Sequence, residues 1–313
     1  MTDRAHVPVL RDEVLGFLEP GPGRRFVDGT FGFGGHSEAL LDAGAEVLGL
    51  DLDEEAVGAC RRISTDRPRL SCQRRSFREL EAALQERGWE SIDGLLLDLG
   101  VSSRQLDDPA KGFSYRAEGP LDLRFHQQHG RPARELLVQT DEKELARILR
   151  DYGEERGARG LARAIKGAGR TEPLRTTAQL VAVITEALPA GAPVNAILSR
   201  VFQALRIAVN EELEALEEAL AQAIQVVAPG GRVAVIAYHS LEDRIVKRRF
   251  DRERRDCLCP PAVPVCQCGH VATLKVLTRR PVTASATELS LNPRARSAKL
   301  RAAEMLPRSR RSH

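Results

Sequence analysis

Asp28-Gly-Thr-Phe-Gly-Phe-Gly-Gly-His-Ser37 is the stretch that decides the fold, and it directly follows Arg25-Phe-Val27. Its glycines allow a strand-to-helix loop to bring backbone amides close to a ligand without interference from Cβ atoms. Glycines also build ordinary tight turns, so the loop alone is a weak signal. A second apolar segment, Glu46-Val-Leu-Gly-Leu-Asp51, ends in an acid where a doubly wound fold places the carboxylate that binds a ribose diol. Together the two segments favour a nucleotide cofactor site.

The spacing of the glycines narrows the class of cofactor. A dinucleotide fingerprint requires G-x-G-x-x-G/A, whereas Gly32 and Gly34 are followed by Ser37 at the third position, which fits NAD poorly. The chain contains no G-x-x-x-x-G-K-[ST] sequence, so a Walker-type phosphate loop is unsupported. An adenosine ligand without a pyrophosphate fits the loop better.

Composition indicates a globular protein. The 313 residues, 42% of them hydrophobic, suffice for one large domain or two of ordinary size. No run of about 18 apolar residues occurs, and residues 1–6 lack the apolar region of a signal peptide. We therefore expect a cytoplasmic protein with no membrane partner.

Basic residues are clustered, although the net charge is only +3. Residues 244–255 include Arg244, Lys247, Arg248, Arg249, Arg252, Arg254 and Arg255, and residues 307–313 are also basic. Clustered cations can neutralise nucleic-acid phosphates. Acidic residues interleave with them and fit a solvated helix face as well, namely Asp243, Asp251, Glu253 and Asp256. Charge alone therefore does not establish a nucleic-acid partner.

Short apolar segments alternate with helix-like segments through the first hundred residues. Strands are predicted over residues 25–28, 46–51, 70–73 and 92–99, and a fifth over 232–238 after the turn Pro229-Gly-Gly231. This βαβα pattern predicts an α/β fold with a parallel sheet.

About 130 residues separate the fourth and fifth predicted strands, far more than one crossover helix needs. Helical periodicity covers residues 143–150, 158–166, 177–188 and 196–209, and the next helix, 211–227, resumes the α/β pattern. We therefore predict a sheet domain, residues 1–108 and 209–313, that contains an inserted helical domain, residues 109–208. The second part of the sheet domain carries a basic and Cys-rich loop at 244–270.

The segment after the fourth strand is a second candidate site, because ligands of open α/β sheets bind beyond the carboxyl ends of strands. It reads Leu97-Asp-Leu-Gly-Val-Ser-Ser-Arg-Gln-Leu-Asp107. Asp98 followed by Ser102 and Ser103 suits a site that binds a cofactor and accepts a proton from an amine. Ser102, Ser103 and Asp107 are also good residues for capping a helix.

A third candidate site follows the fifth strand, at Tyr238-His-Ser-Leu-Glu-Asp-Arg244. His239 could act as a base, contact a substrate or be a satisfied polar residue. Ser240 and Asp243 fit a capping box that opens the basic helix. No G-x-S-x-G elbow occurs, so a serine hydrolase is unsupported.

Several blocks of the chain carry a family resemblance. They are His6-x-Pro-Val-Leu10, the loop 28–37, Asp98-Leu-Gly-Val-Ser-Ser103, Gly112-Phe-Ser-Tyr115, Gly119-Pro-Leu-Asp-Leu-Arg124, Tyr152-Gly-Glu-Glu155, Phe202-Gln-Ala-Leu-Arg-Ile207, His239-Ser-Leu-Glu-Asp-Arg244 and Asn292-Pro-Arg-Ala-Arg-Ser297. With these blocks in order, the chain resembles the MraW-type methyltransferases, which methylate cytosine N4 in small-subunit (16S) ribosomal RNA.

The resemblance implies S-adenosylmethionine as methyl donor and a class I, Rossmann-like methyltransferase sheet domain with an inserted all-helical domain. The implied substrate is one cytidine near the decoding centre, presented by ribosomal RNA or the 30S particle. By motif position, the cofactor-binding residues are Gly34, Gly35, His36, Asp51, Phe77, Asp98 and Gln105. A carboxylate suits a ribose diol, an aromatic ring suits adenine, and amides at a helix start suit a carboxylate.

The chemistry that the resemblance implies depends mainly on positioning, because the methyl donor is already activated. The enzyme must turn the cytosine out, orient its amine and offer a proton acceptor. The candidate acceptors are Asp98, the pair Ser102 and Ser103, and His239. Phosphate contacts are expected from Arg116, Arg124, Arg206, Arg244, Arg294 and Arg296. For Arg206, a buried ion pair is an equal alternative.

Four of the six cysteines form a cluster: Cys257, Cys259, Cys266 and Cys268. Four thiols at this spacing, with His270 nearby, can hold a structural tetrahedral zinc, or can remain reduced in a loop. Disulfides are disfavoured in a cytoplasmic chain, so Cys60 and Cys72 are expected as unpaired core residues.

Two rival functions remain open at this stage. A non-catalytic ribosome-assembly factor could retain a vestigial cofactor pocket. The presence of Gly34, Gly35, Asp51 and Asp98 argues against loss of the cofactor site. A DNA amino-methyltransferase usually carries a D/N/S-P-P-Y/W/F motif, whereas Asp98-Leu-Gly-Val lacks proline, so no DNA partner is expected. The oligomeric state is open.

Overall fold

The computed structural model describes residues 8–260 and 265–307. The described chain divides into two compact units: a helical unit, Val101–Glu212, and a sheet unit formed by the segments on either side of it. His6 and most of the basic C-terminal residues 307–313 lie outside the described residues. None of the described helices is both long and apolar enough to cross a membrane.

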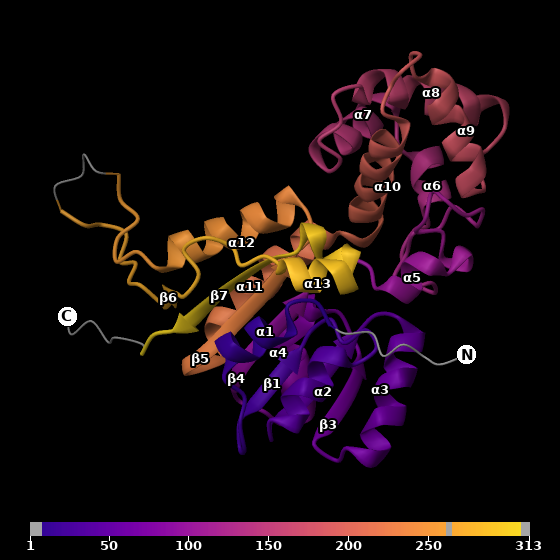
Figure 1. The fold of residues 1–313 in the computed structure, drawn as a ribbon. Helices are drawn as coiled ribbons and strands as arrows, with labels where there is room; N and C mark the ends of the chain where they lie inside the picture. Colours follow the sequence, from indigo (N-terminus) through magenta and orange to yellow (C-terminus); the bar gives the residue numbers. More distant parts are fainter. Residues whose placement is uncertain (1–7, 261–264, 308–313) are drawn as a thin grey trace. The chain divides into compact units, whose positions relative to one another are not determined.

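The sheet unit contains a seven-stranded sheet in the order β3-β2-β1-β4-β5-β7-β6 (Figure 1). The strands are β1 Arg25–Asp28, β2 Glu46–Asp51, β3 Leu70–Arg74, β4 Ile92–Asp98, β5 Val227–Ala237, β6 Leu274–Val276 and β7 Lys299–Met305. Strands β1 to β5 are parallel, and β7 runs antiparallel to both β5 and β6. The Rossmann-like α/β class is therefore confirmed. The chain order reverses between β1 and β4, which is where such sheets bind ligands.

Two features of the sheet differ from the prediction. The five predicted strands are parallel as expected, whereas strands β6 and β7 were not predicted and add an antiparallel edge to the sheet. Strand β5 begins at Val227 rather than at residue 232, since Pro229-Gly-Gly231 is part of the strand and not a turn before it. Val227 pairs with Ile92 and Arg232 pairs with Gly94, so the intervening residues of β5 bulge from the ladder.

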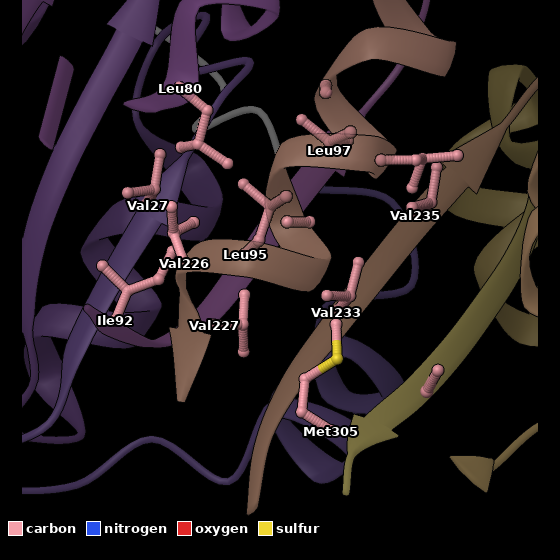
Figure 2. Close-up of a cluster of buried hydrophobic side chains, with 14 of the residues drawn as sticks. Val27, Leu80, Ile92, Leu95, Leu97, Val226, Val227, Val233, Val235 and Met305 are labelled. Atoms are coloured by element: carbon pink, nitrogen blue, oxygen red, sulfur yellow. The ribbon is translucent and has the colours of Figure 1, made fainter. Parts of the chain in front are cut away.

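Helices cover both faces of the sheet because side chains alternate along each strand. They are α1 Arg11–Leu18, α2 Gly35–Asp42, α3 Glu54–Asp66, α4 Leu80–Arg87, α11 Glu212–Val226, α12 Ser240–Glu253 and α13 Ala286–Leu291. On one face Leu95 and Leu97 pack with residues of α4, α11 and α12 (Figure 2). On the other face Leu96 packs with residues of α1, α2 and α3.

Cys60 on α3 and Cys72 on β3 form a disulfide, with their Cα atoms 6.0 Å apart. The expectation of two unpaired core cysteines was therefore wrong. The two cysteines are 12 residues apart in the sequence, and they meet because the chain reverses after α3 so that β3 lies beside this helix.

The helical unit has its own core. Its helices α7 Glu142–Asp151, α8 Ala158–Thr171, α9 Thr177–Ala187 and α10 Val194–Asn210 match the predicted ones. Two short helices were not predicted, α5 Ser103–Asp107 and α6 Ala133–Gln139. Their buried residues recur at helical spacing, as in Leu145, Ile148 and Leu149 of α7.

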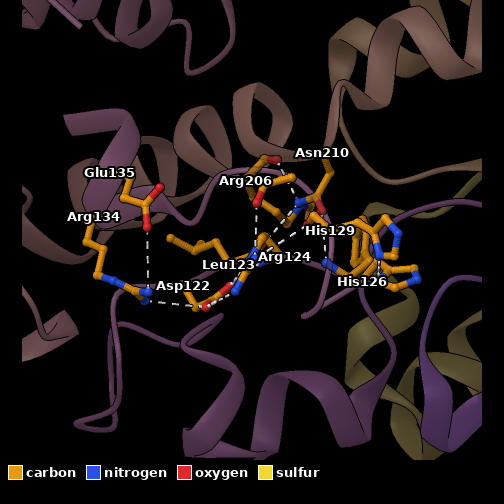
Figure 3. A network of polar contacts seen from close by, with 11 residues as sticks. Asp122, Leu123, Arg124, His126, His129, Arg134, Glu135, Arg206 and Asn210 are labelled. Atoms are coloured by element: carbon orange, nitrogen blue, oxygen red, sulfur yellow. Dashed lines mark hydrogen bonds and ion pairs between the residues drawn. The ribbon is translucent and has the colours of Figure 1, made fainter. Parts of the chain in front are cut away.

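A polar network joins the loop after η2 (Pro109–Lys111) to the end of α10 (Figure 3). Asn210 Nδ2 donates to Leu123 O at 2.7 Å, and Asn210 Oδ1 accepts from Phe125 N at 2.9 Å. Arg124 donates to both oxygens of Asp122, at 2.7 and 2.8 Å. The side-chain pairing of Arg124 is thus largely satisfied within the protein.

Candidate functional site

The loop after β1 forms one side of the candidate site. Gly32 and Gly34 have φ angles of 56° and 89°, a region that favours glycine. A Cβ at Gly34 would lie 2.9 Å from atoms of both Phe31 and Ile63, so this position also requires the absence of a side chain. Helix α2 begins at Gly35, immediately after the loop. The loop therefore presents the amides of a helix start at the ligand-binding edge of the sheet.

Asp51, the last residue of β2, holds this loop. Its Oδ2 accepts from Gly32 N at 2.8 Å, and its Oδ1 accepts from Asp53 N at 2.9 Å. Burial raises the pKa of Asp51 to about 6, despite these two backbone hydrogen bonds. Each carboxylate oxygen has a second lone pair, so both can still accept a hydroxyl from a ligand.

Asp98, the last residue of β4, lies at the centre of a second polar cluster. Its backbone N donates to Thr30 Oγ1 at 2.6 Å, and its Oδ1 accepts from Tyr238 O–H at 2.8 Å. Its Oδ2 lies 3.6 Å from His36 Nε2. Residues that follow β1 and β5 thereby meet Asp98 at the switch point: Thr30 contacts its backbone, and His36 and Tyr238 approach its carboxylate.

His36 and Tyr238 each have a property that suits a ligand site. The His36 side chain is 6% exposed, and its Nε2 makes no hydrogen bond within the described part of the chain. Burial, followed by the proximity of Asp98, raises the pKa of Tyr238 well above its usual value, so the phenol stays protonated and donates. Sequence reasoning assigned no role to Tyr238, although it directly follows the fifth strand.

Asp28 and Ser37 form a buried pair that the sequence analysis did not single out. Ser37 Oγ donates to Asp28 Oδ2 at 2.7 Å, and Thr30 N donates to Oδ1 at 3.2 Å. Burial raises the pKa of Asp28 above its ordinary value. The pair ties the end of β1 to the first turn of α2, and so fixes the glycine loop between them.

His239 is the N-cap of α12, and Glu242 completes its capping box. Its Nδ1 accepts from Glu242 N at 3.4 Å, while its Nε2 lies 3.1 Å from Glu242 Oε1. The expected capping pair, Ser240 with Asp243, was therefore wrong: Ser240 is already the first helical residue. Asp243 instead accepts from Arg301 of β7 at 2.6 Å.

Ser102 and Gln105 lie in the helical unit, where they form the capping box of α5. Ser102 Oγ accepts from Gln105 N at 3.2 Å, and Gln105 Oε1 accepts from Ser102 N at 2.9 Å. The alternative interpretation of Ser102 as a helix cap is confirmed. In the sheet unit, Phe77 opens the 3-10 helix η1 (Phe77–Glu79), and its Cβ lies against Gly29 of the glycine loop.

The arginines proposed for phosphate contact differ in their surroundings. Arg206 donates to both oxygens of Glu212, at 2.8 and 3.0 Å, which confirms an ion pair, although the pair is partly rather than fully buried. The guanidinium of Arg116 lies 5.8 Å from the ring centre of Tyr115. Arg294 and Arg296 are exposed on the 3-10 helix η3 (Pro293–Ser297). One face of α12 exposes a stripe of cations at helical spacing, which are Arg244, Lys247, Arg248 and Arg252, and the exposed Arg255 lies just beyond the end of this helix.

A comparison of sequences identifies the family. The model of the MraW methylase family matches residues 3–306. The chain belongs to the MraW methylase family. A protein from Heliobacterium modesticaldum named "Ribosomal RNA small subunit methyltransferase H" is 48% identical over 308 residues, which are 96% of this chain and 98% of that protein. A protein of the same name from Thermomicrobium roseum is 49% identical over 307 residues, covering 96% and 94% of the two chains. The resemblance inferred from the motifs is confirmed.

The sheet edge fits the methyl donor that the MraW methylase family implies. Gly34 leaves no room for a side chain where the loop turns, His36 Nε2 is buried without a hydrogen bond in the described chain, and Asp51 retains acceptor capacity. Together they offer amides for a carboxylate and a carboxylate for a diol. S-adenosylmethionine carries both groups, the carboxylate on its methionine part and the diol on its ribose.

Proposed function

We propose that this MraW methylase family member transfers a methyl group from S-adenosylmethionine to N4 of a cytidine in the decoding region of 16S ribosomal RNA. The observation that carries the proposal is the convergence of Thr30, His36 and Tyr238 on Asp98, beside the glycine loop. The names of the relatives supply the ribosomal small subunit as the substrate class.

The cofactor pocket follows from the strand ends of the sheet unit. Gly34, Gly35 and His36 would hold the methionine end, because they start helix α2. Asp51 would accept the ribose hydroxyls, and Phe77 would pack against adenine. We also include Gln105 among the cofactor-binding residues, because of its position in the family motif. Its Oε1 accepts a hydrogen bond in the capping box of α5.

The reaction needs a positioned amine and a place for its proton. When bound, S-adenosylmethionine supplies a methyl group on a cationic sulfur, so the C–S electron pair leaves with sulfur as N4 bonds the methyl carbon. Among the three candidate acceptors, Asp98 suits the proton best. Its carboxylate is fixed by Tyr238 and is 24% exposed, so it can be reached from outside. Ser102 and His239 are both engaged as helix caps.

The RNA would be bound by sites beyond the pocket. The exposed cations of α12 can neutralise phosphates, and Lys247 and Arg248 have no ion pair with an acid of the described chain within 4.0 Å. We assign substrate recognition to the helical unit. The acceptor would be the ribosomal RNA, free or within the 30S particle.

The test is transfer of labelled methyl from S-adenosylmethionine to small subunits that lack the endogenous modification. Digestion to nucleosides should place the label in N4-methylcytidine. Subunits that already carry the modification are the matched control and should accept no label. Cofactor binding without transfer to subunits or to free RNA would contradict the proposal and favour an assembly factor.

A further inference from the structure

The four clustered cysteines lie in a loop outside the methyl-transfer site, between α12 and β6. The four sulfur atoms all lie within 4.8 Å of one another. Cys257 Sγ is 3.4 Å from Cys266 Sγ and 3.8 Å from Cys268 Sγ, and the last two are 3.6 Å apart. A tetrahedral zinc with Zn–S bonds of about 2.3 Å separates its sulfurs by about 3.8 Å. The thiols are thus gathered at the spacing that one metal ion requires.

Backbone amides donate hydrogen bonds to three of the four sulfurs. Three backbone amides point at them: Leu258 N donates to Cys268 Sγ at 3.2 Å, Gln267 N donates to Cys259 Sγ at 3.3 Å, and Cys259 N donates to Cys257 Sγ at 3.4 Å. Hydrogen bonds from amides stabilise negative sulfur and orient ligands around a metal.

Simple burial does not explain this cluster. Cys266 and Cys268 are exposed, and their neighbours Val265 and Gln267 are exposed too, so no apolar core draws the four side chains together. The four are not joined as disulfides, unlike Cys60 and Cys72. A bound cation accounts for four convergent sulfurs on an exposed loop.

We propose that Cys257, Cys259, Cys266 and Cys268 bind one zinc ion in a closed structural site. Four thiolates fill a tetrahedral coordination sphere and leave no open position for catalysis. His270 is not required, because its Nε2 lies 3.2 Å from Arg252 O. The site is independent of the methyl-transfer proposal.

Hydrogen bonds already join the two ends of the Cys-containing loop, and zinc would cross-link the loop beyond them. Thr273 N donates to Glu253 O at 2.8 Å, and Thr273 Oγ1 donates to Glu253 Oε2 at 3.1 Å. Leu306 N donates to Thr273 O at 2.9 Å, which joins this base to the end of β7. The metal therefore fixes the segment that follows the basic stripe of α12, rather than the cofactor loop.

The first experiment measures metal content in the full-length chain, purified without a His tag under reducing conditions. One zinc per chain is expected. Cys257→Ser and Cys268→Ser should each lose the metal, whereas the matched control Cys60→Ser/Cys72→Ser should keep it. Four free thiols with no metal, iron in place of zinc, or disulfides within the cluster would each overturn the proposal.

A second measurement uses the unaltered chain and so does not depend on the folding of a variant. Chelation should accelerate hydrogen exchange at the amides of Leu258, Cys259 and Gln267, and added zinc should restore their protection. Cobalt added to the stripped protein should give the absorption of a tetrahedral thiolate complex. Hydrogen exchange that is unchanged by chelation would overturn the zinc site. Binding of S-adenosylmethionine, measured in parallel, tests the methyl-transfer proposal separately.

Discussion

The binding of S-adenosylmethionine should depend on pH through Asp51. Because burial raises the pKa of Asp51 to about 6, its carboxylate is mostly ionised at pH 7 and mostly protonated at pH 5. Only the ionised form offers lone pairs on both oxygens to a ribose while still accepting from Gly32 and Asp53. The association constant should therefore fall by about tenfold from pH 7 to pH 5, since each pH unit below the pKa lowers the ionised fraction about tenfold.

The same shift has a consequence for the free protein. The pKa of Asp51 is higher in the folded chain than its ordinary value of 3.8, so the folded state favours the protonated form. This contribution to stability is fully present below about pH 4 and is lost as the pH rises through about 6. Stabilisation by the cofactor should accordingly grow between pH 5 and pH 7.

Isothermal titration calorimetry with S-adenosylhomocysteine, from pH 5 to pH 8, measures this dependence. Asp51→Asn is the control: it should bind more weakly at neutral pH, by roughly 10-fold to 100-fold for one hydrogen bond to a charged group, and should show a flatter profile. An affinity of the unaltered protein that stays constant across this range would refute the assignment of Asp51. So would an Asn variant with an unchanged profile.

Three further predictions concern other parts of the molecule. Glu212→Gln weakens the partly buried pair with Arg206 and should lower the free energy of unfolding of the helical unit by about 2 to 3 kcal/mol, whereas Glu144→Gln, at an exposed pair, should cost less than about 1 kcal/mol. Denaturant titration compares the two, and equal losses would contradict the role of Arg206. Tyr238→Phe removes the hydrogen bond to Asp98 and should slow methyl transfer by roughly 10-fold to 100-fold with little change in cofactor affinity. Single-turnover rates measure this effect, and an unchanged rate would contradict it. Lys247→Ala/Arg248→Ala should weaken RNA binding and reduce the slope of log K against log salt by roughly 1 to 2, and an unchanged slope would exclude phosphate contact.

The fold could be predicted where the sequence is strongly patterned. Leu95, Leu96 and Leu97 are buried on both faces of the sheet, and such continuous apolar segments are typical of parallel strands. Strand β7 lacks this pattern, because Arg301 and Glu304 interrupt it. Arg301 is nonetheless buried, since it pairs with Asp243 of α12. That compensation depends on a partner 58 residues away, which periodicity does not detect.

The site was predictable to the level of strand ends, but not to the level of side-chain partners. Asp51 and Asp98 follow from their positions after apolar strands. The link from Tyr238 to Asp98 spans 140 residues, and the disulfide of Cys60 depends on how α3 folds back onto β3. Serine is the commoner N-cap, so Ser240 was the natural expectation. The extended backbone of His239, with φ −137° and ψ 167°, places the cap one residue earlier.

The choice among the proton acceptors leads to the last prediction. Asp98→Asn keeps an oxygen for the Tyr238 hydroxyl and removes only the negative charge, so the fold and the cluster should persist. If Asp98 accepts the amine proton, the rate at saturating S-adenosylmethionine should fall by about 100-fold or more, the usual contribution of general base catalysis. Asp93→Asn, on the same strand at the opposite edge of the sheet, is the matched control and should retain the rate.

Ser102→Ala and His239→Ala complete the comparison, because each removes a helix cap that contributes about 1 kcal/mol to stability. Both should transfer methyl groups at near-normal rates once cofactor is saturating. A carboxylate can take a proton without first losing one of its own, whereas the Ser102 hydroxyl cannot act as a comparable base, and the ring of His239 is held by Glu242. A large loss in either cap variant together with an active Asp98→Asn would move the acceptor away from the sheet edge.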